Sequence, residues 1–228
     1  IKSMPSMHFK AICFDLDGTL LDSLADLAKC TNKILLERGF PEHPVEAFRY
    51  FAGDGAKMML TRALPEEARE KSIIEECKQD FEAAYRKCYD ELTHPYKDIP
   101  ELLDELTYRQ QKLAVLSNKP HEFTILTVKH LLPNCKFEIV LGQREGVSPK
   151  PDPEGMLEIC YQLGLPANTF LYLGDTATDM KTAVAAGCFP VGVLWGFRTE
   201  EELLDNGARA TVNMPLDVID LLNENFQM

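Results

Sequence analysis

The fold is decided by the stretch Lys10-Ala11-Ile12-Cys13-Phe14-Asp15-Leu16-Asp17-Gly18-Thr19. Its apolar run leads directly into two carboxylates, and a glycine and a hydroxyl follow. A short apolar run of this kind is typical of a strand that is buried on both faces of a parallel sheet. Because Gly18 interrupts the strand pattern, we expect Asp15 and Asp17 on the loop at the strand's carboxyl end, where open α/β sheets bind ligands. An ordinary strand-to-loop transition would fit this stretch equally well, so the rest of the chain has to decide.

The composition restricts the possible partners of the protein. The chain has 228 residues and a net charge of −12, which argues against binding to a nucleic-acid backbone. A small anionic substrate would need local positive charge or a bound cation at its site. We find no apolar run long enough to cross a membrane and no signal-peptide pattern, so the sequence predicts a cytoplasmic protein.

The cysteines point to the same compartment. There are seven of them, scattered along the chain without a CxxC pair. This pattern predicts neither a disulfide framework nor a structural zinc site, and it indicates a reducing environment.

Two kinds of hydrophobic periodicity divide the chain. Residues 22–92 show helical spacing and no convincing strand, with Ser23 and Asp26 as an expected N-terminal cap and Pro65 at the start of an expected long helix. From about residue 99 onward, helical segments alternate with short apolar strands, which are expected at 112–116, 137–141, 170–173, 190–194 and 210–212. This alternation predicts an α/β core with a Rossmann-like parallel sheet and helices on both faces. We therefore expect a core domain of residues 1–21 and 93–228, interrupted by an inserted all-helical cap domain of residues 22–92.

Polar residues follow several of the expected core strands. Ser117 and Asn118 follow the second strand, Lys150 lies after the third, and Asp175 and Asp179 follow the fourth. Taken alone, the aspartates fit a helix N-terminus, the Ser-Asn pair fits a turn, and Lys150 fits a surface lysine. Their order and their shared position after consecutive strands favour a single site instead.

This set of side chains suits phosphoryl transfer. Clustered carboxylates repel each other, and a hard divalent cation with vacancies for water and phosphate, Mg²⁺ above all, would relieve that repulsion. Ser117, Asn118 and Lys150 can then stabilise the charge that builds on a phosphoryl group. One aspartate can attack phosphorus while a second protonates the leaving oxygen, and Asp15 and Asp17 fit these two roles.

The chain resembles the haloacid dehalogenase superfamily of aspartate-nucleophile phosphatases. The resemblance extends from His8 onward and rests on four stretches, which are Phe14-Asp15-Leu16-Asp17-Gly18-Thr19-Leu20, Leu116-Ser117-Asn118-Lys119, Lys150-Pro151-Asp152-Pro153 and Gly174-Asp175 with Asp179. Within the superfamily the chain is most similar to the phosphoglycolate phosphatase-like branch, on local signs such as Asp22-Ser23, Gly53-Asp54-Gly55 and His94-Pro95-Tyr96.

The resemblance implies a role for each matching residue. It makes Asp15 the nucleophile, and Asp17 the general acid and base, with its main-chain carbonyl on Mg²⁺. It makes Asp175 the third protein ligand of the metal, and it gives Asp179 a supporting place. Thr19 is expected to orient the nucleophile. Ser117 and Lys150 are expected to bind phosphate, helped by the backbone amide of Asn118, and the helical insert is expected to close over the site and exclude water.

The resulting prediction is a Mg²⁺-dependent phosphatase that acts on a small phosphorylated metabolite, with 2-phosphoglycolate as the best single substrate and with the protein a monomer or a homodimer. Two alternatives stay open. A sugar phosphomutase could share the fold, and a catalytically silent binding protein is the other, although all four of Asp15, Asp17, Lys150 and Asp175 are present. A dehalogenase is disfavoured because Asp17 would have no leaving oxygen to protonate.

Overall fold

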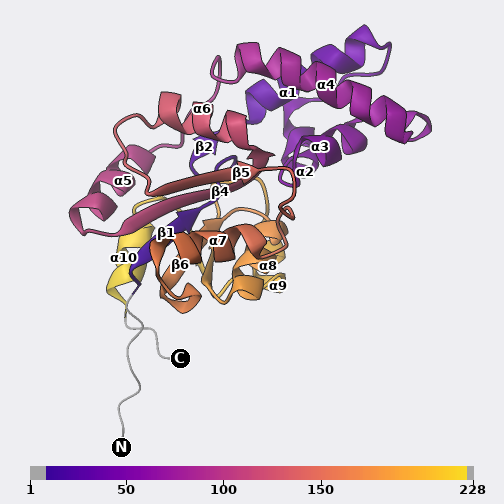
Figure 1. The fold of residues 1–228 in the computed structure, drawn as a ribbon. Helices are drawn as coiled ribbons and strands as arrows, with labels where there is room; N and C mark the ends of the chain where they lie inside the picture. The colour runs from indigo at the N-terminus through magenta and orange to yellow at the C-terminus, as the bar shows by residue number, and fades with distance from the viewer. Residues whose placement is uncertain (1–8, 225–228) are drawn as a thin grey trace, which may run out of the picture.

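The computed structural model describes residues 9–224 and contains a six-stranded sheet with the order β5-β4-β1-β6-β7-β8 (Figure 1). Every strand pair in this sheet is parallel. The predicted α/β class, with a parallel core sheet and helices on both faces, is confirmed. The strands are β1 (Ala11–Phe14), β4 (Lys112–Pro120), β5 (Ile139–Gln143), β6 (Phe170–Gly174), β7 (Phe189–Val193) and β8 (Ala210–Val212).

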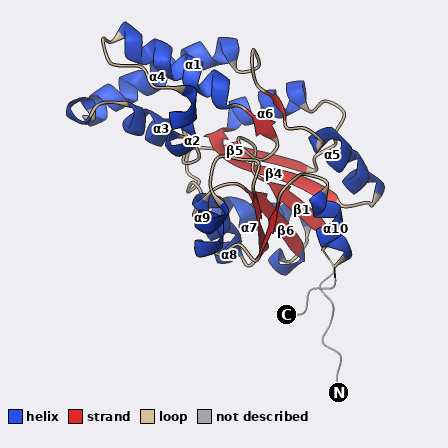
Figure 2. Ribbon diagram, turned by 180° about the vertical axis from the view of Figure 1, so that it is seen from behind, coloured by secondary structure: helices blue, strands red, loops and turns tan. Residues whose placement is uncertain are grey.

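Strand β1 lies at the centre because both of its faces are apolar. Ile12 and Phe14 pack into one cluster with α5 and α10, while Ala11 and Cys13 pack into a second cluster with α7 and α8. Alternation of side chains along a strand produces this division. Figure 2 shows the core helices on the two sides of the sheet. They are α5 (Ile99–Tyr108), α6 (His121–Leu131), α7 (Glu154–Leu163), α8 (Ala177–Ala186), α9 (Glu200–Asp205) and α10 (Asp217–Asn223).

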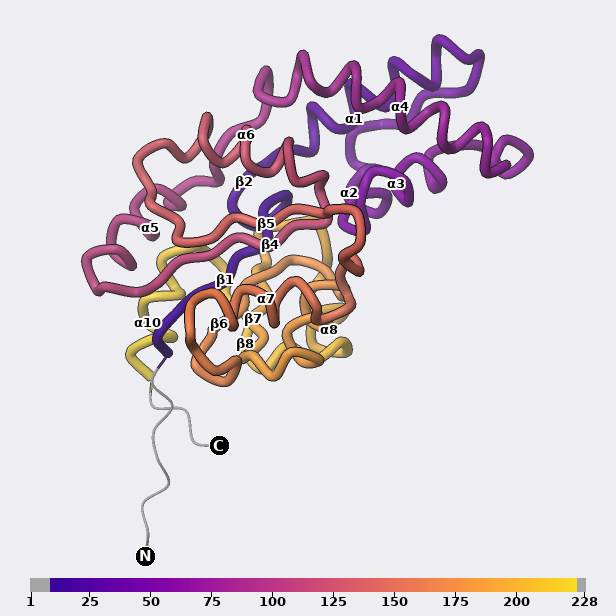
Figure 3. The backbone as a smooth tube through the Cα atoms, viewed as in Figure 1, coloured from indigo at the N-terminus to yellow at the C-terminus, as the bar shows by residue number. Residues whose placement is uncertain are grey.

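A separate group of helices follows β1 in the chain and lies over one end of the sheet (Figures 1 and 3). Its apolar cluster is centred on Phe48, Leu60 and Phe81, and two core residues, Phe123 and Phe197, complete it. We call this group the cap. Its elements are α1 (Leu24–Glu37), a 3₁₀ turn (Val45–Ala47), α2 (Phe48–Phe51), α3 (Ala56–Ala63), a second 3₁₀ turn (Glu66–Ala68) and α4 (Lys71–Cys88).

The two segments that connect the cap to the core lie side by side. Strands β2 (Leu21–Asp22) and β3 (His94–Pro95) pair antiparallel at this crossing. Ser23 is the N-cap residue of α1, as predicted, but neither its side chain nor that of Asp26 makes a capping hydrogen bond. Instead, Asp26 Oδ2 accepts hydrogen bonds from the backbone N–H groups of Leu92 and Thr93 and from the Thr93 hydroxyl. The carboxylate therefore ties the two connections together.

Three further expectations need correction. The helix expected from Pro65 is divided into a 3₁₀ turn (Glu66–Ala68) and α4, which begins only at Lys71 after Glu70 adopts an extended conformation. Strand β4 continues to Pro120 through an irregular register, and β5 lies two residues later than predicted, with Gln143 paired to Pro120 in that extension. Cys30 and Cys88 form a disulfide between α1 and α4, although the cysteine pattern predicted none. The other five cysteines are free.

Residues 1–8 of the expected core, and its last four residues, lie outside the described part of the chain. Within residues 9–224, none of the helices combines the length and apolar character that a membrane span requires.

Candidate active site

The carboxyl ends of the three central strands bring the predicted residues together. Asp15 follows β1, Ser117 lies near the end of β4, and Asp175 follows β6. Because β4, β1 and β6 are adjacent and parallel, their ends meet at one edge. Lys150, from the loop before α7, reaches the same place from the other side of Asp15. All four residues are buried.

Lys150 is held by three acceptors at this edge. Its Nζ donates to Asp15 Oδ1 at 2.9 Å, to Asp179 Oδ1 at 2.7 Å and to the Leu116 carbonyl at 3.1 Å. Burial alone would lower the pKa of Lys150, but the charges of Asp15 and Asp179 outweigh burial and raise this pKa. The ammonium group is therefore charged and fixed next to the predicted nucleophile.

The carboxylates at this edge are in excess over the positive charge. Asp15, Asp175 and Asp179 each offer an oxygen, and these oxygens lie within 4.8 Å of one another. Burial, with a contribution from Asp179, raises the pKa of Asp15 to about 7. Burial, followed by Asp15 and Asp179, also raises the pKa of Asp175. Lys150 alone does not balance the cluster, and oxygen donors in this arrangement suit Mg²⁺.

Asp175 and Asp179 differ in how far their oxygens are already used. Asp179 Oδ1 is paired with Lys150, while its Oδ2 accepts from the Thr176 hydroxyl and from the backbone N–H groups of Asp175 and Thr176. These contacts form a capping box at the start of α8. Each Asp175 oxygen accepts a single hydrogen bond, from Thr19 or from Phe197. Asp175 therefore has more capacity for a metal, and Asp179 is suited to holding Lys150.

The backbone at Gly18 packs so closely against Asp175 that no side chain fits at position 18. Gly18 has a φ of +88°, and a Cβ there would lie 2.1 Å from Asp175 Oδ2. The glycine is needed both for its backbone conformation and for this close approach. The Thr19 hydroxyl, which the resemblance placed on Asp15, instead donates to Asp175 Oδ1 at 3.1 Å. This expectation for Thr19 is corrected: its partner is the expected metal ligand.

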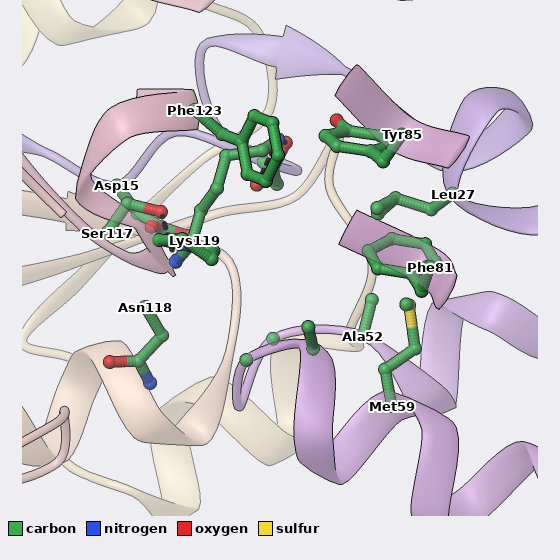
Figure 4. A pocket seen from close by; sticks show the side chains of 15 residues that line it. Asp15, Leu27, Ala52, Met59, Phe81, Tyr85, Ser117, Asn118, Lys119 and Phe123 are labelled. Carbon is green, nitrogen blue, oxygen red and sulfur yellow. Dashed lines mark hydrogen bonds and ion pairs between the residues drawn. The ribbon is translucent and has the colours of Figure 1, made fainter. Parts of the chain in front are cut away.

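The two polar residues of β4 differ in the direction of their side chains. Ser117 lines a cavity together with Asp15 and Asp17. The Asn118 side chain makes two hydrogen bonds to the backbone of Lys150, at 2.9 and 3.0 Å, and Figure 4 shows it turned away from Asp15 and Ser117. Its amide thus positions the loop that carries Lys150, which leaves only the Asn118 backbone for a phosphate.

Lys119 is a site residue that the sequence did not reveal. It is only 7% exposed, and its Nζ pairs with both carboxylate oxygens of Asp17, at 2.8 and 3.0 Å. The same nitrogen lies 4.9 Å from the centroid of the Tyr85 ring, which comes from α4 of the cap. The only available signal was its place next to Ser117 and Asn118.

The cavity lies between the core edge and the cap. Its volume is about 50 Å³. On the cap side its wall is formed by Leu27, Met59, Phe81 and Tyr85, which face Asp15 and Ser117 across the opening (Figure 4). Phe123 of the core adds a further apolar surface.

Polar contacts hold the cap against the core beside this cavity. The Thr178 hydroxyl at the start of α8 donates to Asp54 of the cap. Arg198 donates to the carbonyls of Tyr50 and Ala52, and Arg49 of the cap donates to the Gly196 carbonyl at 2.8 Å. The structure therefore shows the cap docked over the strand ends.

Comparison with known proteins agrees with this geometry. The model of the haloacid dehalogenase-like hydrolase family matches residues 12–193. The chain is 32% identical to a phosphoglycolate phosphatase of Mannheimia succiniciproducens, over 87% of this chain and 92% of the relative. It is 29% identical to the N-acetylmuramic acid 6-phosphate phosphatase of Pseudomonas aeruginosa, over 95% of this chain and 97% of the relative.

A solved structure from Lactobacillus delbrueckii subsp. bulgaricus, provisionally assigned as a phosphoglycolate phosphatase, superimposes with a TM-score of 0.89. It is 29% identical in sequence, and the match covers 95% of this chain and 99% of that structure.

Proposed function

Because the chain belongs to the haloacid dehalogenase-like hydrolase family and is an enzyme of its phosphatase kind, we propose that it hydrolyses a small phosphate monoester through an aspartyl phosphate on Asp15, with the help of Mg²⁺. The best single substrate is 2-phosphoglycolate. The observation that carries this proposal is the asymmetry of Asp15. Its Oδ1 is held by Lys150, while no hydrogen bond from a described residue reaches its Oδ2. That oxygen is available to attack phosphorus.

Asp15 and Asp17 divide the reaction between them. An oxygen of Asp15 forms a bond to phosphorus while the bond from phosphorus to the ester oxygen breaks, and Asp17 gives its proton to the leaving oxygen. In the second half, Asp17 takes a proton from water as that water attacks phosphorus, which releases inorganic phosphate and restores Asp15. Both aspartates line the same cavity, as this sequence of steps requires.

The other residues stabilise the transferring group. Ser117 and the backbone N–H of Asn118 are placed to donate to phosphoryl oxygens, and Lys150 supplies positive charge beside Asp15. Mg²⁺, held by the carboxylates of Asp15 and Asp175 and the main-chain carbonyl of Asp17, would neutralise charge on the phosphoryl oxygens. The docked cap keeps bulk water away from the reacting atoms.

Two observations support a small substrate. The cavity of about 50 Å³ has room for only a few water-sized groups. Its cap wall is mostly apolar, so it would leave the hydroxyls of a sugar without partners. Several relatives at about 30% identity are phosphoglycolate phosphatases, which makes phosphoglycolate the first ester to test.

The test is a panel of small phosphate esters, assayed for phosphate release with Mg²⁺ and after its removal by a chelator. We expect hydrolysis to need Mg²⁺, and we expect Asp15→Asn to lose about 10⁴-fold or more in kcat. Asp104→Asn, an exposed aspartate on α5, serves as the matched control. Metal-independent turnover, or full activity in Asp15→Asn, would contradict the mechanism. Accumulation of an isomeric sugar phosphate without phosphate release would indicate a mutase instead.

A further inference from the structure

Lys119 has no part in the steps proposed above, although it is buried at the centre of the cavity. Its ammonium lies between Asp17 of the core and the face of Tyr85 of the cap. A lysine ammonium is charged at neutral pH, and both carboxylate oxygens of Asp17 hold this one in place where the cap meets the core.

The two lysines of the site contact different aspartates. Lys150 contacts Asp15, which takes the phosphoryl group, whereas Lys119 contacts Asp17, which protonates the leaving oxygen. Lys119 therefore belongs to the side of the leaving group. A lysine stem has four rotatable carbons, so the ammonium can turn from Asp17 toward a bound molecule without movement of the backbone.

The other described side chains that line the cavity carry no positive charge. Of the described residues that line the cavity, Lys119 is the only one with a cationic side chain. Asp15 and Asp17 would repel a second negative charge on the substrate, and Leu27, Phe81 and Phe123 cannot pair with it. Among the described side chains that line the cavity, Lys119 alone can form an ion pair with an anionic leaving group.

We propose that Lys119 determines specificity by pairing its ammonium with a carboxylate of the leaving group. The substrates selected in this way are phosphate esters of small hydroxy acids, in which the carboxylate lies close to the ester oxygen. This inference rests on the proposed function, because it assumes that Asp17 faces the leaving group.

The experiment compares two esters with two-carbon leaving groups of different charge. These are 2-phosphoglycolate, whose leaving group carries a carboxylate, and ethyl phosphate, whose leaving group is neutral. We expect Lys119→Met to lower the ratio of kcat/KM between the two esters by about 100-fold, because the carboxylate loses its only cationic partner. Lys119→Arg, which keeps the charge, should retain most of the preference. Lys129→Met, at an exposed lysine of α6, should leave the ratio unchanged.

Each outcome bears on one claim. An equal loss on both esters would overturn the inference, since Lys119 would then act only by positioning Asp17. Full activity of Lys119→Met on both esters would overturn it as well. Lys119→Gln gives the same comparison if Lys119→Met does not fold. The proposed function fails separately, and takes this inference with it, if the wild-type enzyme hydrolyses neither ester or if Asp15→Asn retains full activity.

Discussion

The two sides of the cavity differ in polarity: the core side is charged and the cap side is apolar. On the core side, Asp15 and Asp17 line the cavity and are each paired with a lysine, and behind Asp15 the Lys150 ammonium is also held by Asp179. On the cap side, the described lining residues carry no ionised side chain, and Leu27, Met59 and Phe81 present apolar surface. A preorganised polar side suits chemistry on a phosphoryl group, which is common to all substrates. An apolar side selects mainly by size and shape, which differ between substrates.

Only a few polar links join the two sides. Arg198 and Arg49 donate to backbone carbonyls across the boundary, and Asp54 accepts from Thr178. Lys119 lies at the same boundary, with one contact on each side. The comparison therefore predicts that core substitutions affect every substrate alike, whereas changes at the boundary or in the cap affect substrate choice or cap docking.

The largest effect is expected at Lys150. Lys150→Met removes a donor beside the phosphoryl group and leaves Asp15 and Asp179 without their shared cation. We expect kcat/KM to fall by about 10³-fold for phosphoglycolate and for ethyl phosphate alike. Lys112→Met, at an exposed lysine at the other end of β4, is the matched control. A loss confined to one ester would break the division between core and cap.

Most of this core side could be predicted from the sequence. Short apolar runs followed by Asp15, Ser117 and Asp175 indicated parallel strands, and parallel strands place their ends together without any knowledge of side-chain contacts. The loop around Lys150 alone would fit an ordinary surface lysine. Lys150 was predicted as a site residue because it follows the third expected strand of the core. Gly18 marked the end of the first strand in the sequence, and the structure gives it a φ of +88°, which favours glycine.

The contacts that the sequence did not reveal depend on distant segments. Lys119 contacts Asp17, 102 residues away in the chain, and Tyr85, which lies on a cap helix whose docking no periodicity predicts. Asp26 was assigned to a helix cap because its true partners, Leu92 and Thr93, lie 66 and 67 residues further along the chain. Cys30 and Cys88, 58 residues apart, pair only because α1 packs against α4. Local sequence patterns predict helices, strands and their apolar faces. These contacts between distant residues depend on how the helices and strands pack against one another.

A smaller effect is expected at Thr19, which contacts Asp175, a proposed ligand of Mg²⁺. Thr19→Val keeps the shape of the side chain and removes the hydroxyl that donates to Asp175 Oδ1. We expect the Mg²⁺ concentration for half-maximal activity to rise by about tenfold, because residues that orient metal ligands have effects of this size. Thr19→Ser should restore the wild-type requirement. An unchanged Mg²⁺ dependence in Thr19→Val would show that Asp175 needs no such support.

The links between cap and core should have a weaker effect, and chiefly on substrate affinity. Arg198→Met removes the hydrogen bonds to Tyr50 and Ala52. We expect KM to rise by about fivefold with a smaller change in kcat, because a loosened cap must be ordered when substrate binds. Arg209→Met is the control, since this exposed arginine stacks on Phe189, a core residue of β7. A fall in kcat with KM unchanged would place Arg198 in the chemistry instead.

The smallest effect is expected at Tyr85, and it tests whether the cap side acts by shape. Tyr85→Phe keeps the ring whose face lies next to the Lys119 ammonium and removes only the hydroxyl. Because the attraction between a cation and an aromatic face persists with phenylalanine, kcat/KM for phosphoglycolate should change by less than about threefold. Tyr85→Leu, which removes the aromatic face, should lower it further than Tyr85→Phe does. If the Phe variant were as impaired as the Leu variant, the hydroxyl would be the functional part of Tyr85, and the cap would contribute polar recognition as the core does.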